Sequence, residues 1–182
     1  GMWAFAWLNL RNNRLMLSRD RLGIKPLYFY RTDDRLYFAS EIKTILEMSQ
    51  ERFYLNYQAV GEYLAQSLLD TSEKTFFVGI DKLSPASYCI IDLNTDSIKL
   101  EFKTYWNMKY QEACSYGEED LAEQIRALFF DSVKLRMRSD VPVGVLLSGG
   151  IDSSSIAAAM KHSIGNGSEL KLISAVSNDS RY

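Results

Sequence analysis

The residues of this 182-residue chain with the clearest chemistry lie in a turn at 148–154, whose sequence is Ser-Gly-Gly-Ile-Asp-Ser-Ser. Adjacent glycines let the backbone approach a ligand closely and present successive N–H groups to it. The serine hydroxyls add donors, and a helix that begins here would contribute unpaired N–H groups and partial positive charge. The turn therefore favours the binding of a phosphate chain.

Asp152 is negatively charged and would repel a phosphate bound at this turn, so it needs a cation between the two. A bound Mg²⁺ would supply one, because Mg²⁺ accepts carboxylate and phosphate oxygens together. In the simplest alternative, the glycines only join a strand to a helix, and Asp152 and Ser153 cap that helix. The full seven-residue string favours binding over this alternative. It has neither the Lys of a Walker A loop nor the third Gly of a dinucleotide-binding loop.

The elements around this turn are predicted to form a βαβ unit. Residues 143–147 are a short, continuously apolar run, which is typical of a strand buried on both faces. A helix is expected from about 153 to 163, ended by Gly165-Asn166-Gly167, and a second apolar strand covers 170–176. Open α/β sheets bind ligands at the carboxyl ends of such strands.

Two segments lead into this unit. Residues 105–117 lose hydrophobic periodicity and are expected to be a linker. Ser115 and Glu118 have the spacing of a capping box at a helix start. Behind them apolar residues recur at helical spacing, at Leu121, Ile125, Leu128, Phe129, Val133 and Leu135.

The first hundred residues favour antiparallel strands joined as a meander by short turns. Ser40 is predicted to cap a short helix that follows the strands. The expected elements are strands at 2–10, around Leu15 and Leu17, at 27–31 and at 35–39, a helix at 56–69, a loop at 70–78, and a hairpin of 86–93 with 97–102 around residues 94–96.

The composition excludes several classes of protein. A net charge of −2 argues against an electrostatic nucleic-acid binder. There is no run of about 18 apolar residues to span a membrane, and Gly1-Met2-Trp3 lacks the basic start of a signal peptide. Two cysteines suit a reducing compartment, so a cytoplasmic location is expected. The single histidine, His162, argues against His-rich metal sites and is assigned no catalytic role.

Three motifs carry a resemblance to a known family. Residues 143–154, Val-Gly-Val-Leu-Leu-Ser-Gly-Gly-Ile-Asp-Ser-Ser, resemble the pyrophosphate loop of the N-type ATP pyrophosphatases, and most closely that of the glutamine-dependent asparagine synthetases. Residues 19–28 and 38–43 resemble signatures of that family's N-terminal glutamine amidotransferase domain, which has an Ntn-hydrolase fold. Residues 1–6 look like an interior strand of the same domain.

The resemblance implies an α+β segment followed by an α/β segment. Residues 1–110 would be the C-terminal part of an Ntn-type amidotransferase domain. Residues 118–182 would hold the first βαβ unit of an ATP pyrophosphatase domain of the adenine nucleotide alpha hydrolase-like kind. The implied reaction is ATP-dependent amidation of aspartate through an aspartyl-adenylate, with ammonia taken from glutamine.

The same resemblance implies the ligands and the residues that bind them. ATP, Mg²⁺, glutamine and aspartate are the expected small molecules, with no nucleic acid or membrane, and exposed sheet edges are expected to favour a homo-oligomer. Asp152 would meet Mg²⁺ through the pyrophosphate. The pyrophosphate positions are Ser148, Gly149, Gly150, Asp152 and Ser153, and the adenosine positions are Leu147 and Val176.

The family's amidotransferase nucleophile is an N-terminal cysteine, whereas this chain begins with Gly1, so no catalytic residue is assigned. Cys89 is predicted to be a buried structural thiol, and Cys114 lies in the linker without a basic neighbour. We therefore expect an internal fragment of a longer enzyme that is inactive by itself. A β-lactam synthetase-like adenylating relative, and an inactive domain or interaction module, remain as alternatives.

Four other residues in the first half have more than one interpretation. Arg19 and Asp20 form either a catalytic pair or a structural ion pair, and a role across the family would require burial. Glu41 either caps a helix or contacts the other domain. Lys25 could pair with a substrate phosphate, but it lies in the other predicted domain, which disfavours that role.

Overall fold

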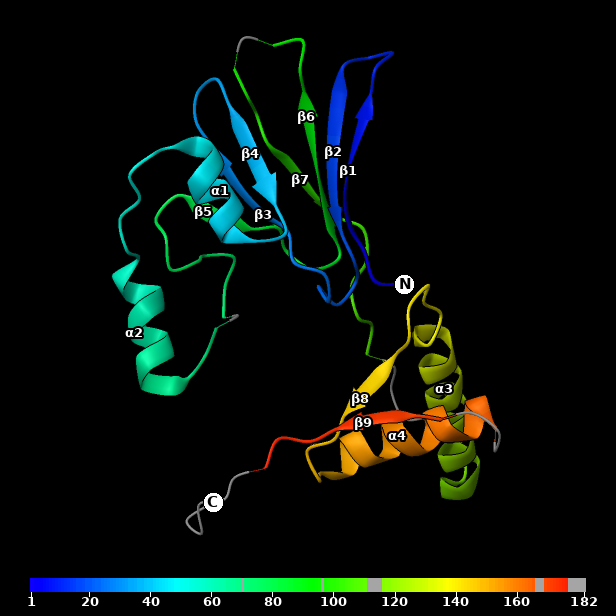
Figure 1. Ribbon diagram of the computed structural model, residues 1–182. Helices are drawn as coiled ribbons and strands as arrows, with labels where there is room; N and C mark the ends of the chain where they lie inside the picture. The colour runs from blue at the N-terminus through cyan, green and yellow to red at the C-terminus, as the bar shows by residue number, and fades with distance from the viewer. Residues whose placement is uncertain (70, 96, 111–115, 166–168, 177–182) are drawn as a thin grey trace. The chain divides into compact units, whose positions relative to one another are not determined.

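The computed structural model describes residues 1–69, 71–95, 97–110, 116–165 and 169–176. The chain forms two compact units, Gly1–Tyr110 and Gln111–Tyr182 (Figure 1). No helix in the described ranges is long and apolar enough to cross a membrane.

The first unit contains a four-stranded antiparallel sheet in the order β1-β2-β6-β7. One pair in this sheet is the hairpin of β1 (Ala4–Asn9) and β2 (Arg14–Arg19). The other pair is β6 (Ser87–Asp92) and β7 (Glu101–Thr104), which confirms the predicted second hairpin. Asp96, in the expected turn, lies outside the described residues.

A second, three-stranded sheet has the order β4-β3-β5. It consists of β4 (Leu36–Ala39), β3 (Tyr28–Arg31) and β5 (Ile80–Lys82), all antiparallel. The prediction of one meander is therefore wrong, because the chain changes sheet between β2 and β3. The predicted loop at 70–78 stops just short of β5, and two isolated bridges, Leu55 with Phe77 and Lys74 with Asp81, tie it to the fold.

Two helices follow β4 in this unit. α1 (Ile42–Ser49) turns Ile45, which has no exposed surface, toward β3 and β4. Glu41 is the N-cap of α1 and makes no capping hydrogen bond, so the prediction of a Ser40 cap is wrong. α2 (Tyr57–Gln66) has Asn56 as its N-cap, whose side chain accepts a bond from the Ala59 N–H.

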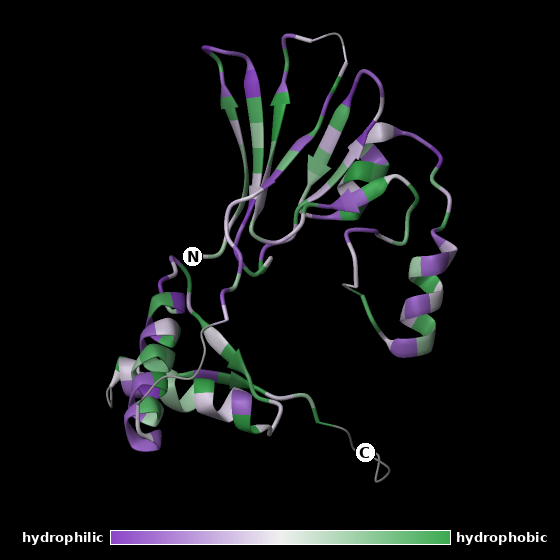
Figure 2. Cartoon of the chain, turned by 180° about the vertical axis from the view of Figure 1, so that it is seen from behind, coloured by the Kyte–Doolittle hydropathy of each residue, from purple (hydrophilic) through white to green (hydrophobic). Residues whose placement is uncertain are grey.

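The core of the first unit joins its two sheets. Residues of the four-stranded sheet contact residues on or next to the three-stranded one, and the apolar segments along the strands are visible in Figure 2. Alternation in β6 buries every second side chain, as the period-two pattern of a half-buried strand requires. The buried cluster contains Leu17, Cys89 and Ile91 with Leu27, Phe29 and Leu83.

Asp20 organises the crossover from β2 to β3. Its side chain is 1% exposed and accepts hydrogen bonds from four backbone N–H groups, those of Leu22, Ile24, Lys25 and Trp3, at 2.9–3.3 Å. Burial acts to raise the pKa of Asp20, but these N–H donors together lower it. The carboxylate is thus stabilised without a cation.

Arg19 satisfies the complementary set of backbone groups. Its guanidinium donates to the carbonyl oxygens of Lys25, Leu83 and Gly23 at 2.7–2.8 Å. None of the ion pairs among the described residues joins Arg19 to Asp20, so the predicted ion pair is wrong. Gly23 has φ +65°, and an added Cβ would lie 2.9 Å from Pro85 Cγ, so glycine is required there.

The second unit is the predicted βαβ unit preceded by a long helix. α3 (Glu118–Arg136) leads to β8 (Gly144–Leu146), α4 (Ile151–Ile164) and β9 (Lys171–Ile173). β8 and β9 pair in parallel, which confirms the βαβ arrangement. The buried cluster of this unit is Val133, Val145, Ala159 and Met160.

Two sequence-based expectations for this unit are wrong in detail. β8 is not buried on both faces, since Val145 is buried but Leu146 is 76% exposed in a two-stranded sheet. α3 begins at Glu118 with Gly117 as its N-cap and has no side-chain cap, so Glu118 does not occupy the N3 position of a capping box. Ser115, the proposed cap, lies outside the described residues.

Replacing Asp20 by Asn should destabilise the first unit by roughly 2–3 kcal/mol, because an amide presents an N–H₂ group to backbone donors and loses charge-assisted bonds. The lowered folded pKa places this stabilisation above about pH 4, and it is lost as pH falls through the folded pKa. The free energy of unfolding in urea should be much lower for Asp20→Asn than for wild type at pH 7. The difference between the two proteins should shrink at pH 3.

Asp33→Asn is the matched control, because Asp33 lies on an exposed turn. It should leave the free energy of unfolding within about 0.5 kcal/mol of the wild-type value. Equal midpoints for wild type and Asp20→Asn at pH 7 would contradict the role given to this carboxylate.

Candidate functional site

The glycine turn connects β8 to α4 in the second unit. Gly149 has φ +85° and an added Cβ would meet nothing within 4 Å, so the backbone there is left-handed and faces open space. Gly150 is the N-cap of α4, with extended dihedral angles and no capping side chain. A side chain at Gly149 would be strained, and the turn therefore depends on this glycine.

Ser153 holds the turn closed from the first turn of the helix. Its hydroxyl accepts a bond from the Ser148 N–H at 3.3 Å and donates to the Gly150 carbonyl at 3.2 Å. It also lies 3.1 Å from the Ser148 hydroxyl. The two serines, five positions apart in the sequence, are thus brought together.

The start of α4 leaves backbone donors without helical partners. The first bond across the turn runs from the Ser154 N–H to the Gly150 carbonyl at 3.2 Å. The N–H groups of Ile151, Asp152 and Ser153 precede this bond and have no intrahelical acceptor. Together with the serine hydroxyls, they form a set of donors suited to a multiply charged anion.

Asp152 lies exposed in the first helical turn beside these donors. Among the described residues there is no group of three or more His, Cys, Asp or Glu side chains that could hold a metal. A single exposed carboxylate fits Mg²⁺ only if other oxygens, such as those of phosphate, complete its shell. The Asp152 carboxylate is therefore compatible with Mg²⁺ that arrives together with a phosphate ligand.

Leu147 and Val176 differ in how the structure places them. Leu147 pairs with the end of β9, since its N–H donates to the Ile173 carbonyl at 2.8 Å. Its own carbonyl accepts a bond from the Ser174 hydroxyl, also at 2.8 Å. Val176 follows β9 and is 86% exposed. Sequence reasoning missed Ser174, because nothing in its local sequence indicates a bond to a residue 27 positions earlier.

The thiol of Cys89 belongs to the buried core of the first unit. Cys89 is 1% exposed, and burial raises the pKa of its thiol to about 11. The prediction of a buried structural thiol is therefore confirmed. Cys114 lies outside the described residues. His162 lies in the last turn of α4, edge-on to the Phe130 ring at 5.1 Å.

The candidate residues of the first unit have structural contacts. The Lys25 side chain is exposed, while its backbone N–H and carbonyl bond Asp20 and Arg19. Glu41 forms an exposed ion pair with Lys43 at 2.6 Å. Such surface pairs contribute little to stability.

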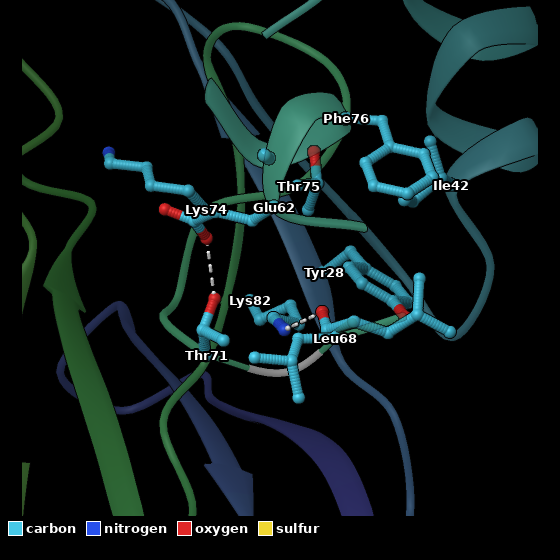
Figure 3. Close-up of a pocket in the computed structure, with 11 residues that line it drawn as sticks. Tyr28, Ile42, Glu62, Leu68, Thr71, Lys74, Thr75, Phe76 and Lys82 are labelled. Carbon is cyan, nitrogen blue, oxygen red and sulfur yellow. Dashed lines mark hydrogen bonds between the residues drawn. The ribbon is translucent and has the colours of Figure 1, made fainter. Parts of the chain in front are cut away.

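A cavity of about 240 Å³ in the first unit was not predicted from sequence (Figure 3). Its polar lining is engaged in holding the chain around it. Lys82 Nζ donates to the Leu69 carbonyl at 3.3 Å, and the Thr71 hydroxyl donates to Glu62 at 2.8 Å, which lowers the pKa of Glu62. These bonds tie the chain around the cavity to α2, through Glu62, and to β5, through Lys82.

Comparison with known proteins assigns both units. Residues 1–106 match the family model of the glutamine amidotransferase domain, and residues 124–181 match that of asparagine synthase. The first match covers more than half of the chain, which therefore belongs to the glutamine amidotransferase family. The resemblance to glutamine-hydrolysing asparagine synthetases, drawn from three motifs, is confirmed by the two matches and by the relatives that follow.

Relatives resemble the chain across both units. A putative asparagine synthetase [glutamine-hydrolyzing] 2 of Methanocaldococcus jannaschii is 36% identical over 163 residues, which is 88% of this chain and 31% of the relative. Asparagine synthetase [glutamine-hydrolyzing] 1 of Bacillus subtilis is 36% identical over 161 residues, which is 88% of this chain and 24% of the relative. Amidase chry2 of Gibberella zeae is 34% identical over 177 residues, which is 93% of this chain and 25% of the relative. The chain thus spans about a quarter to a third of the length of these relatives.

Cys89 should resist alkylation in the folded protein. A pKa of about 11 instead of 9 leaves about 100-fold less thiolate at pH 8, and burial also blocks access. With Cys114 replaced by Ser, Cys89 is the only thiol. Iodoacetamide should then label it at least 100-fold more slowly than the urea-unfolded chain. Equal labelling rates in the folded and unfolded states would contradict its assignment as a buried structural thiol.

Proposed function

We propose that this chain is part of a glutamine-dependent asparagine synthetase, an ATP-dependent carbon–nitrogen ligase of the cytoplasm. In this proposal residues 1–110 belong to an Ntn-type amidotransferase domain and residues 118–182 to an ATP pyrophosphatase domain. The family matches in that order along the chain support it. The proposed substrates are glutamine, aspartate and ATP.

The observation that carries the proposal is the turn between β8 and α4. It combines a left-handed glycine, an uncapped helix start and two facing serine hydroxyls within the segment that matches asparagine synthase. We assign pyrophosphate binding to Ser148, Gly149, Gly150, Asp152 and Ser153 on this basis. These donors would stabilise the negative charge of a departing pyrophosphate electrostatically.

The remaining assignments follow from the neighbouring strand ends. Leu147, held at the end of β9, and Val176, with an exposed side chain, are proposed to contact the adenosine. Mg²⁺, when bound with the nucleotide, would offset phosphate charge and meet Asp152. In the proposed reaction an aspartate carboxylate oxygen attacks the α-phosphorus of ATP and pyrophosphate leaves. Ammonia from glutamine then displaces AMP from the aspartyl-adenylate.

Asp152→Asn should weaken binding of Mg²⁺-pyrophosphate at least tenfold, because the amide is a poor ligand for Mg²⁺. Asp131→Asn is the matched control, since Asp131 is exposed on α3. Titration calorimetry on the 182-residue chain with Mg²⁺ present should show unchanged affinity for the control. Identical dissociation constants for wild type and Asp152→Asn would remove Asp152 from the site.

A further inference from the structure

The two strands of the second unit separate where the glycine turn begins. Gly144, Val145 and Leu146 of β8 pair in register with residues 171–173 of β9. The ladder continues one bond further, from the Leu147 N–H to the Ile173 carbonyl at 2.8 Å. If the parallel ladder continued, the Leu147 carbonyl would accept the next evenly spaced bond from a backbone N–H group.

At that next position the donor is a side chain. The Ser174 hydroxyl donates to the Leu147 carbonyl at 2.8 Å. This bond joins residues 27 positions apart and fixes the last peptide before the turn leaves the sheet. Ser174 lies outside the three motifs and is not one of the residues proposed to contact the nucleotide.

A peptide bond is planar and trans, so the Leu147 carbonyl and the Ser148 N–H point in opposite directions from one rigid unit. Holding the carbonyl toward Ser174 therefore directs the Ser148 N–H away from β9. The structure shows that this N–H points into the turn, where it donates to the Ser153 hydroxyl at 3.3 Å. The hydroxyl of Ser174, the residue after β9, thus sets the orientation of a donor inside the turn.

We infer that Ser174 is a positioning residue for pyrophosphate binding: its bond to the Leu147 carbonyl orients the Leu147–Ser148 peptide so that the Ser148 N–H bonds the Ser153 hydroxyl, which holds the turn in the shape that binds the anion. This inference rests on the proposed function of the turn. Pre-orientation removes a backbone rotation that the ligand would otherwise have to fix, and this improves affinity without a direct contact.

The test compares three variants of the full 182-residue chain. Ser174→Ala removes the hydroxyl, and Ser174→Thr keeps one on a side chain suited to an extended backbone. Ser163→Ala is the matched control, because the Ser163 hydroxyl donates to the Ala159 carbonyl at 2.9 Å within α4, away from the turn. The two readouts are the dissociation constant of Mg²⁺-pyrophosphate by calorimetry and the exchange rate of the Ser148 amide by NMR without ligand.

Ser174→Ala should raise the dissociation constant roughly three- to tenfold, the effect of losing one hydrogen bond. It should also speed exchange of the Ser148 amide severalfold. Ser174→Thr should restore both values, and Ser163→Ala should change neither.

Two outcomes would overturn the inference. If Asp152→Asn weakens binding but Ser174→Ala leaves both readouts at wild-type values, Ser174 has no positioning role and the proposed function stands. If the wild-type chain binds no Mg²⁺-pyrophosphate, the proposed function and this inference fail together.

Discussion

Asp20 places a carboxylate inside the first unit among four backbone N–H groups, and the arrangement of both sheets depends on it. The chain leaves the four-stranded sheet at Arg19 and enters the three-stranded sheet at Tyr28. Buried backbone groups in such a crossover need partners, because each unsatisfied one costs about 1–3 kcal/mol. Asp20 supplies acceptors and Arg19 supplies donors. Their side chains replace the backbone ladder where the sheet ends.

The same physical requirement is met differently in the second unit. There the chain also leaves a sheet, after β8, and hydroxyl groups bond the backbone at Leu147, Ser148 and Gly150. At the crossover the Asp20 carboxylate is buried, and it satisfies the backbone N–H groups around it. The turn at 148–150 is exposed, and the first N–H groups of α4 have no capping side chain. The backbone N–H groups at the first loop are paired within the unit, while those at the start of α4 have no capping side chain.

The sequence predicted the elements whose patterns are local. The apolar run before Ser148 and the two glycines were enough to predict a strand, a turn and a helix, and β8 and β9 do pair in parallel. Sequence could not predict the division into two sheets, because strand pairing depends on contacts between residues far apart in the chain. β5 is three residues long and includes the charged pair Asp81 and Lys82, so no hydrophobic period marks it. Ser174 was missed for the same reason, since its partner is distant in sequence.

The proposed reaction requires the protein that contains this chain to form an aspartyl-adenylate from ATP. The most direct measurement uses full-length protein with aspartate labelled with ¹⁸O in its side-chain carboxylate, ATP, Mg²⁺ and an ammonia source. Attack of the carboxylate on the α-phosphorus transfers one labelled oxygen to AMP when ammonia displaces it. Mass spectrometry should therefore find ¹⁸O in AMP and none in pyrophosphate. Formation of asparagine with unlabelled AMP, or with label in phosphate or pyrophosphate, would contradict the account.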